Sequence, residues 1–264
     1  MTGSLSIVGI GLYDEQDISL RGLAEAKKAD VIYLELYTSL MPAFSKESLE
    51  HLIGKKVIVV SRSDLEEDAD TGILKTAHNL NVCLLIPGDP FVATTHISLR
   101  IAAEKLGIPT KVIHAASIIS AIPGATGLQS YKFGRSVSVP FPRGEFFSET
   151  PYSVIRENRI RGLHTMVLLD LDVEVPRLMS IREALSILLK LEEEHGDGVV
   201  EEETLAIGIA RIGSLDVEIQ AGEVRELVGH NFGSPPHVLI FLGDLHFLEK
   251  EALEVFANLS DKAC

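Results

Sequence analysis

The apolar run Val82-Cys83-Leu84-Leu85-Ile86 constrains the fold most, because it ends abruptly at Pro87-Gly88-Asp89-Pro90. An unbroken apolar run of this length is typical of a strand buried on both faces, as in a parallel sheet. The two prolines cannot donate a backbone hydrogen bond, so the strand stops there, and a helical pattern follows over residues 92–106. Asp89 is therefore predicted at the carboxyl end of a strand, where open α/β sheets bind ligands. A turn that binds nothing would have the same residues.

The first half of the chain alternates strand-like and helix-like segments. Predicted strands cover residues 5–10, 31–36, 57–60, 82–86 and 110–113. Predicted helices cover residues 20–28, 46–53, 70–79 and 92–106, and Asp17 or Ser19 can cap the first of them. Apolar strands that alternate with helices predict a mostly parallel sheet covered on both faces.

The second half follows a different pattern. Strands are predicted over residues 136–139, 165–170, 205–210, 217–219 and 237–241, and helices over 151–160, 180–191 and 247–256. Two of these strands, 205–210 and 217–219, are close enough in sequence to form a hairpin, so a mixed sheet with antiparallel members is expected. Ser180 and Glu183 have the spacing of a capping box. Because small residues and glycine increase near residues 114–124, we expect two α/β domains, 1–113 and 114–264.

Composition excludes several classes of protein. The formal net charge of −14 over 264 residues argues against a broad basic surface for nucleic acid and against a polybasic membrane patch. No apolar stretch approaches the roughly 18 residues that a membrane span needs, and no charged segment precedes the first apolar run, so a cytoplasmic protein without a secretory signal is expected. The cysteines, Cys83 and Cys264, form no metal-binding pair.

Local motifs leave the chemistry open. Gly9-Ile10-Gly11 lacks the third glycine of a dinucleotide-binding loop, since position 14 is aspartate. The backbone at Gly11-Leu12 can either approach a ligand closely or simply form a tight turn. His237 follows Pro235-Pro236, which restrict the chain before it, but a histidine at a strand edge would look the same. No serine-nucleophile elbow, zinc-binding motif or metal-ligand spacing is present.

Small or polar residues follow several of the predicted strands. They are Gly11-Leu12, Asp89, His114 to Ser117, Asp170 and Ala210. Strand ends that converge in this way can line a cleft between two α/β domains. The residues alone name no ligand for such a cleft.

Three stretches of the chain, residues 8–12, residues 87–90 with 93–96, and residues 205–213, carry a resemblance to a known group of proteins. They resemble the tetrapyrrole-methylase-like superfamily of S-adenosylmethionine-dependent methyltransferases. A second set is similar to one branch of that superfamily and consists of 11–15, 35–39, 114–118, 131–134 and 235–237. The resemblance implies two α/β domains with S-adenosylmethionine in the cleft between them, in a homodimer. It also implies an activity, the trimethylation of the amino group that a 3-amino-3-carboxypropyl arm carries on a histidine of translation elongation factor 2.

The resemblance also implies a set of cofactor contacts, carried over position by position: Leu12, Asp89, Val92, Ser117, Ile118, Leu169, Ala210 and His237. No metal, nucleic acid or membrane is implied. No general base is named: Tyr37, Asp170 and His237 qualify by type alone, and bulk water can serve instead. The alternatives are a methyltransferase acting on a corrin or sirohaem precursor, which the match at residues 35–39 disfavours, and a protein that binds S-adenosylmethionine without turnover.

Overall fold

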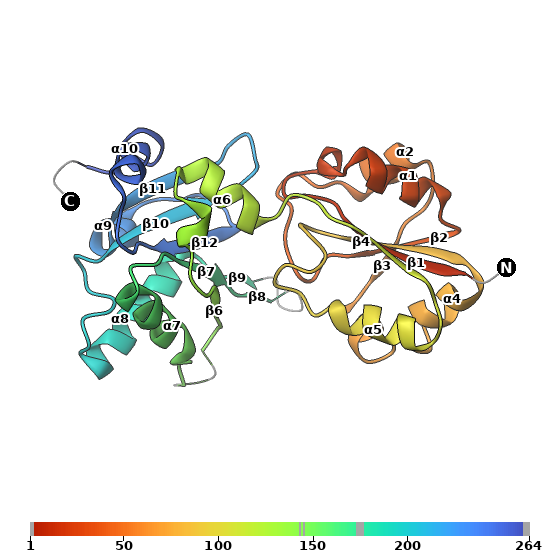
Figure 1. Ribbon diagram of the computed structural model, residues 1–264, viewed down its shortest axis with the longest axis horizontal. Helices are drawn as coiled ribbons and strands as arrows, with labels where there is room; N and C mark the ends of the chain where they lie inside the picture. Colours follow the sequence, from red (N-terminus) through yellow and green to blue (C-terminus); the bar gives the residue numbers. More distant parts are fainter. Residues whose placement is uncertain (1–2, 143, 145, 173–176, 261–264) are drawn as a thin grey trace. The chain divides into compact units, whose positions relative to one another are not determined.

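The computed structural model describes residues 3–142, 144, 146–172 and 177–260, which leaves Cys264 outside. The chain forms two compact units, residues 1–119 (unit 1) and 120–264 (unit 2), and Figure 1 draws both. The predicted bounds of independently folding domains, 1–113 and 114–264, stay a prediction. So does the predicted cofactor cleft between the domains.

Unit 1 is built on a five-stranded sheet in the order β3-β2-β4-β1-β5. Its strands are β1 (Ser4–Gly9), β2 (Val31–Glu35), β3 (Ile58–Val60), β4 (Asn81–Ile86) and β5 (Thr110–Ile113). Every neighbouring pair is parallel, so the predicted parallel sheet is confirmed. The central strand β4 is buried from Val82 to Ile86, as an unbroken apolar run requires.

Helices cover both faces of this sheet, with α1 and α2 on one face and α4 and α5 on the other (Figure 1). The helices are α1 (Leu20–Lys28), α2 (Lys46–Ile53), α3 (Arg62–Glu66), α4 (Ile73–Asn79) and α5 (Ile97–Lys105), with a 3₁₀ turn η1 (Glu15–Asp17). Two apolar cores result, one on each face of the sheet.

Two helix predictions in unit 1 need correction. α5 begins at Ile97 and not at about residue 92, because Ala93 has a φ of 56°, which an α-helix cannot contain. The short helix α3 was not predicted. It has a capping box formed by Ser61 and Asp64, and its five residues are too few to show helical periodicity.

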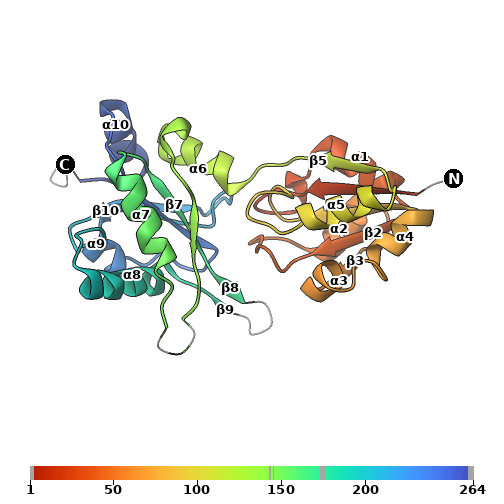
Figure 2. The ribbon, with the colours of Figure 1, turned by 60° about the horizontal axis from the view of Figure 1, so that its bottom comes forward.

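Unit 2 contains a mixed five-stranded sheet in the order β11-β10-β12-β7-β6. The strands are β6 (Val137–Val139), β7 (Thr165–Leu169), β10 (Leu205–Ala210), β11 (Glu218–Glu223) and β12 (His237–Phe241). Only β6 and β7 pair in parallel within this sheet, and β10 and β11 form the predicted hairpin. Two short strands, β8 (Leu171–Asp172) and β9 (Arg177–Leu178), pair separately (Figure 2). The predicted α/β class, with a parallel sheet in the N-terminal part and a mixed sheet in the C-terminal part, is confirmed.

The helices of unit 2 lie beside its sheet (Figure 1). They are α7 (Thr150–Ile160), α8 (Ile181–His195), α9 (Val224–Gly229) and α10 (Phe247–Phe256), with α6 (Ile118–Thr126) at the junction of the units and a 3₁₀ turn η2 (Ser130–Lys132). The main apolar core lies between the sheet and α7, α8 and α9. Ser180 caps α8 and forms the predicted capping box with Glu183. α9 was not predicted.

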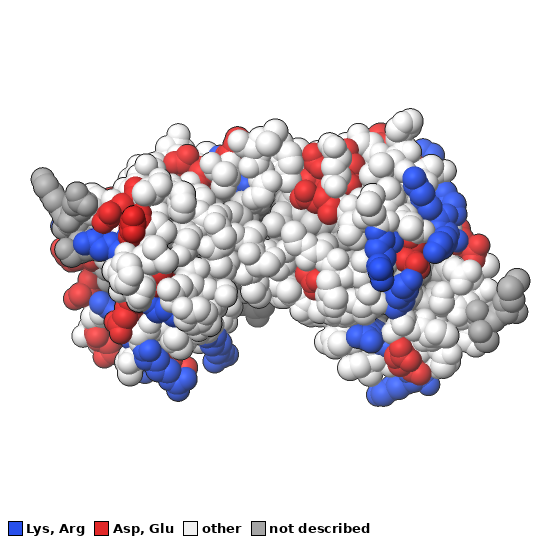
Figure 3. Space-filling view, turned by 45° about the horizontal axis from the view of Figure 1, so that its top comes forward, with Lys and Arg blue, Asp and Glu red and all other residues white. Residues whose placement is uncertain are grey.

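Lys and Arg side chains gather on the face of unit 1 that α1 and α2 cover (Figure 3). Lys27 and Lys28 end α1, while Lys55 and Lys56 lie between α2 and β3, and all four are exposed. Lys56 lies 2.7 Å from a carboxylate oxygen of Glu50, so the positive charge is partly neutralised. No helix in the described part of the chain is long and apolar enough to span a bilayer.

Candidate functional site

The carboxyl ends of β1 and β4 form the point of unit 1 where a ligand is expected. These strands are neighbours, but the chain leaves β1 toward β2 on one side and leaves β4 toward β5 on the other. Such a switch in direction opens a crevice at the carboxyl ends of the two strands, which is where open α/β sheets bind ligands.

Two glycines join the loops at this switch point. Gly88 N donates to Gly11 O at 2.6 Å, and Gly11 N donates to Gly88 O at 3.4 Å. A Cβ at Gly9 would lie 2.5 Å from Gly88 O, so only glycine allows this approach. The contact brings the segments that carry Leu12 and Asp89, two predicted cofactor contacts, to one place.

The loop after β1 is shaped by Asp17. Its Oδ2 accepts from Leu12 N at 2.9 Å and from Tyr13 N at 2.8 Å. Of the two residues predicted to cap α1, Ser19 does so, accepting from Gly22 N at 3.1 Å. Since the Leu12 N–H is used within the loop, its half-buried side chain is what it can offer a ligand, as an apolar wall.

Asp89 lies at the end of β4 as predicted and links two loops. Its Oδ1 accepts from Phe91 N at 3.1 Å, while its Oδ2 lies 2.7 Å from His114 Nδ1 and accepts from Ala115 N at 3.3 Å. The carboxylate therefore holds its own turn and the loop after β5. Because a carboxylate has about four acceptor positions, one is still open to a ligand hydroxyl or ammonium.

The remaining predicted contacts of unit 1 lie in the two segments that Asp89 joins, the turn after β4 and the loop after β5. Val92 N donates to Asp89 O at 3.2 Å, so a ligand can use the Val92 carbonyl or side chain. Ser117 is buried, and Ile118 after it begins α6. A hydroxyl at this place can serve a polar ligand group near a helix N-terminus.

The three predicted contacts of unit 2 meet at one end of its sheet. Ala210 ends β10 and is paired with His237, which begins β12 in the antiparallel direction. Leu169 ends β7 and follows Leu168, the partner of Val238. The sheet thus brings together three residues that are far apart in the sequence.

His237 presents a buried hydrogen-bond donor at this end of the sheet. Ile181 N donates to its Nδ1 at 3.3 Å, which places the ring proton on Nε2. Nε2 is buried and has no hydrogen-bond partner in the described part of the chain. Burial lowers the pKa of the imidazole and outweighs the opposing effect of the nearby Gly233 and Ser234 backbones, so the ring is neutral near pH 7. An orphaned N–H donor of this kind fits a ligand that carries an acceptor atom.

Comparison with known proteins decides the family. Residues 4–228 match the family described as "Tetrapyrrole (Corrin/Porphyrin) Methylases". The chain belongs to this family. Diphthine synthase of Methanosarcina mazei is 48% identical over 259 residues, 96% of each chain. Diphthine synthase of Methanocaldococcus jannaschii is 44% identical over 252 residues, 95% of this chain and 97% of that protein. A crystal structure of diphthine synthase matches with a TM-score of 0.90 at 39% identity, covering 98% of each chain.

The predicted resemblance to the tetrapyrrole methylases, and among them to diphthine synthase, is therefore confirmed. As a member of a methylase family the chain is a methyltransferase, as predicted. The eight cofactor contacts stay a prediction: the structure groups five of them in unit 1 and three in unit 2.

Two of the residues named as bases by type, Tyr37 and His237, are poorly suited to that task. Tyr37 is buried, which raises the pKa of its phenol and keeps it protonated. Asp170 accepts from Phe141 N at 2.8 Å and from Leu171 N at 3.0 Å, one bond to each oxygen. His237 Nδ1 is occupied by Ile181 N, so the ring acts as a donor.

Sequence reasoning missed two residues that shape the site. Asp17 was predicted only as a possible cap, and Arg211, next to Ala210, was not singled out. Asp17 could have been suspected from its place just after a glycine-rich strand end. Arg211 gives no comparable signal, because its partners depend on strand pairing.

Proposed function

We propose that this protein uses S-adenosylmethionine to methylate, three times, the amino group of the 3-amino-3-carboxypropyl arm on a histidine of translation elongation factor 2. The product is diphthine, in the biosynthesis of diphthamide. The observation that carries the proposal is the set of relatives named diphthine synthase, which are 41–48% identical over nearly the whole chain. As the acceptor is an elongation factor, we place the protein in the cytoplasm, and we propose a homodimer.

Both units supply groups that suit the cofactor. Asp89 can accept hydrogen bonds from a ribose hydroxyl or from the ammonium of the methionine part, and His237 can donate from Nε2 to an acceptor atom. Leu12, Ile118 and Leu169 can supply apolar walls. Because a sulfonium makes its methyl group electrophilic, the chain needs mainly to align the reactants and exclude water.

The proton balance assigns the remaining chemistry to solvent. Each transfer forms one N–C bond as one S–C bond breaks, and the amine must be neutral to attack. One proton therefore leaves the amine for every methyl group added, three in all. With Tyr37 protonated and His237 acting as a donor, we assign these protons to water.

The direct test combines purified protein, methyl-labelled S-adenosylmethionine, and elongation factor 2 that carries the unmethylated arm. We expect label on the elongation factor and a mass increase of three methyl groups. Bound cofactor without transfer would contradict the proposal and support a non-catalytic binding protein. Transfer to a corrin or sirohaem precursor instead would support the small-molecule alternative.

Asp89 provides the test of the cofactor site. Asp89→Asn keeps the shape of the side chain but removes its charge, so we expect cofactor binding to weaken by roughly tenfold. Asp89→Ala should weaken binding further and also lower thermal stability, since the turn and the loop after β5 both lose an acceptor. Calorimetry with S-adenosylhomocysteine measures the affinity.

Asp70→Asn, the same change at an exposed carboxylate of unit 1, is the matched control. We expect it to bind as the unaltered protein does. Equal affinities for Asp89→Asn and Asp70→Asn would remove Asp89 from the site.

A further inference from the structure

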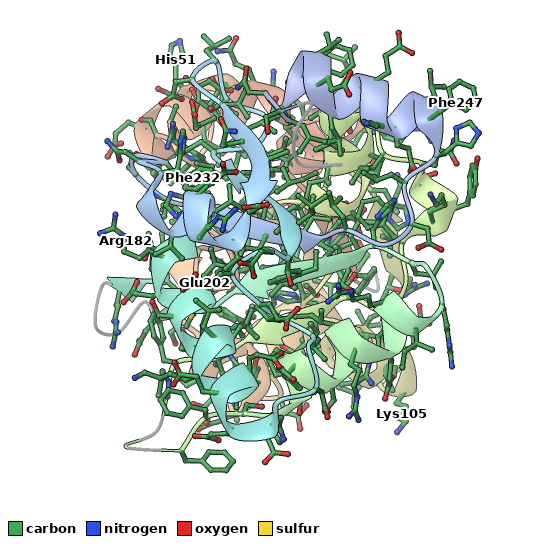
Figure 4. The ribbon with its side chains drawn as sticks, turned by 90° about the vertical axis from the view of Figure 1, so that its left-hand side faces the viewer. His51, Lys105, Arg182, Glu202, Phe232 and Phe247 are labelled. Atoms are coloured by element: carbon green, nitrogen blue, oxygen red, sulfur yellow. The ribbon has the colours of Figure 1, made fainter. Side chains whose placement is uncertain are left out.

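Arg211 directly follows Ala210 and is largely buried, at 9% exposure. Its Nη1 donates to two backbone carbonyls, Phe232 O at 2.8 Å and Ser234 O at 2.6 Å, and Phe232 is labelled in Figure 4. Nε donates to Asp216 Oδ2 and Nη2 to Asp216 O, each at 2.8 Å. The guanidinium thus binds two separate segments of unit 2 at once.

The backbone of Arg211 holds the same segment as its side chain does. Arg211 N donates to Pro236 O at 2.8 Å, so residues 232–236 are fixed at three carbonyls. A Cβ at Gly233 would lie 3.2 Å from Arg211 Nη1, so the backbone of this segment packs closely against the guanidinium. His237 comes immediately after it.

Arg211 has a φ of 54°, in the left-handed region that favours glycine. Non-glycine residues remain in that region where surrounding contacts hold them. Here the contacts are those of the guanidinium, which a lysine cannot reproduce, because an ammonium is a point donor without the planar fork. The guanidinium contacts thus add to the backbone bonds of Arg211 with Pro236 and Ser214 in holding this conformation.

We propose that Arg211 is a positioning residue for the cofactor. By fixing residues 232–236, it sets where the strand-end pair of Ala210 and His237 stands and where the free Nε2–H of His237 points. The inference rests on the proposed function, since it assigns Arg211 to the same cofactor site. On this proposal Arg211 affects the affinity for the cofactor and takes no part in the chemical step.

The test is Arg211→Lys, with S-adenosylhomocysteine binding measured by calorimetry and with methyl transfer to elongation factor 2 measured by steady-state kinetics. We expect the Kd and the KM for the cofactor to rise by roughly tenfold or more. We expect kcat at saturating cofactor and the KM for elongation factor 2 to stay within about threefold of the unaltered values. A merely structural loss would instead lower the active fraction and leave both KM values unchanged.

Arg225→Lys is the matched control, because Arg225 is an exposed arginine of unit 2 in ion-pair contact with Glu203 at 3.4 Å. It should leave all constants unchanged. Asp216→Ala is the second variant, because it removes one contact of the guanidinium but keeps both Nη1 bonds. We expect the Kd and the KM for the cofactor to rise by about threefold, with the other constants unchanged.

The outcomes separate the two proposals. Unchanged cofactor affinity in Arg211→Lys overturns the inference, and if that variant does not fold, unchanged affinity in Asp216→Ala overturns it. Unaltered protein that binds cofactor without modifying elongation factor 2 contradicts the proposed function and leaves the affinity test of Arg211 intact. Unaltered protein that binds no cofactor contradicts both.

Discussion

Two buried glutamates, Glu35 in unit 1 and Glu249 in unit 2, have the same side chain and the same 0% exposure but opposite pKa shifts. The pKa of the Glu35 carboxyl is raised, and that of Glu249 is lowered to about 2. Burial disfavours the charged form of both. The two carboxylates differ in their hydrogen-bond donors and neighbouring charges, so burial alone does not decide whether a carboxylate is ionised.

Glu249 is at the start of α10 and is surrounded by donors. Its oxygens lie 2.5 Å from Lys132 Nζ and 3.1 Å from His164 Nε2, and they accept from Gln129 N and His246 N. Gly243 N donates to His164 Nδ1, so the His164 proton is on Nε2 and points to the carboxylate. Burial opposes ionisation of Glu249, but these bonds outweigh it and lower the pKa.

Glu35 ends β2 and accepts, within the described part of the chain, from neutral donors that lie close in sequence. They are Tyr37 N at 2.9 Å, Thr38 N at 3.1 Å and the Thr38 hydroxyl. The nearby His96 lies 3.8 Å away, but burial lowers the pKa of its ring to about 4, so it is neutral at pH 7. Burial therefore outweighs the hydrogen bonds at Glu35. A cation in direct contact separates the two sites: Lys132 bonds to Glu249, whereas the charge of Arg62 is the weakest of the influences on the pKa of Glu35.

The largest effect should come from Glu249→Gln. The change leaves the half-buried Lys132 ammonium without its counter-charge, so we expect the free energy of unfolding to fall by about 3 kcal/mol. Urea denaturation measures it, with Glu251→Gln at an exposed position of the same helix as the control. Equal losses in the two variants would show that the cluster does not anchor α10.

Glu35→Gln should cost less, about 1–2 kcal/mol, because the amide oxygen still accepts backbone N–H groups and no charge is left behind. The same denaturation experiment compares it with Glu249→Gln. A loss as large as that of Glu249→Gln would break the comparison, since a charge would then matter equally at both sites.

The smallest effect is a difference in pH dependence, at most about 1.4 kcal/mol per pH unit. The folded pKa of Glu249 lies below the unfolded value of 4.5, so its stabilisation is complete above pH 4.5 and is lost as the pH falls toward 2. The folded pKa of Glu35 lies above 4.5, so its ionisation destabilises the protein as the pH rises past 4.5.

Denaturation of the unaltered protein and of each glutamine variant between pH 3 and 7, a range of roughly two units around the reference pKa of glutamate, tests these signs. The stability difference should shrink at low pH for Glu249→Gln and should shrink at high pH for Glu35→Gln. Parallel curves for the two variants would contradict the opposite pKa shifts.

The sequence predicted the strands well because their apolar runs are continuous and end at clear breakers, as at Pro87. It failed where tertiary contacts override a local pattern. The pattern from residue 92 onward is helical, but the left-handed Ala93 delays α5 to Ile97.

The site residues at strand ends could be predicted from the sequence, but the contacts that hold them in place could not. Asp89 could be placed because it follows an apolar run directly. The strand order that joins Gly11 to Gly88 is not encoded in any local pattern, and neither are the carbonyls that Arg211 binds. Two hydrogen-bonding groups separated by many residues can be paired only once the strands are paired.

The lysines near β3 have a consequence for association in solution. β3 is an edge strand, and its residues Ile58 and Val59 are 50% and 49% exposed. The unpaired backbone groups of such a strand can pair with a strand of another molecule. Lys55 and Lys56 stand exposed just before this strand. Lysines beside an exposed edge strand oppose edge-to-edge pairing in sheet proteins generally, because a second copy that docks there brings like charges together.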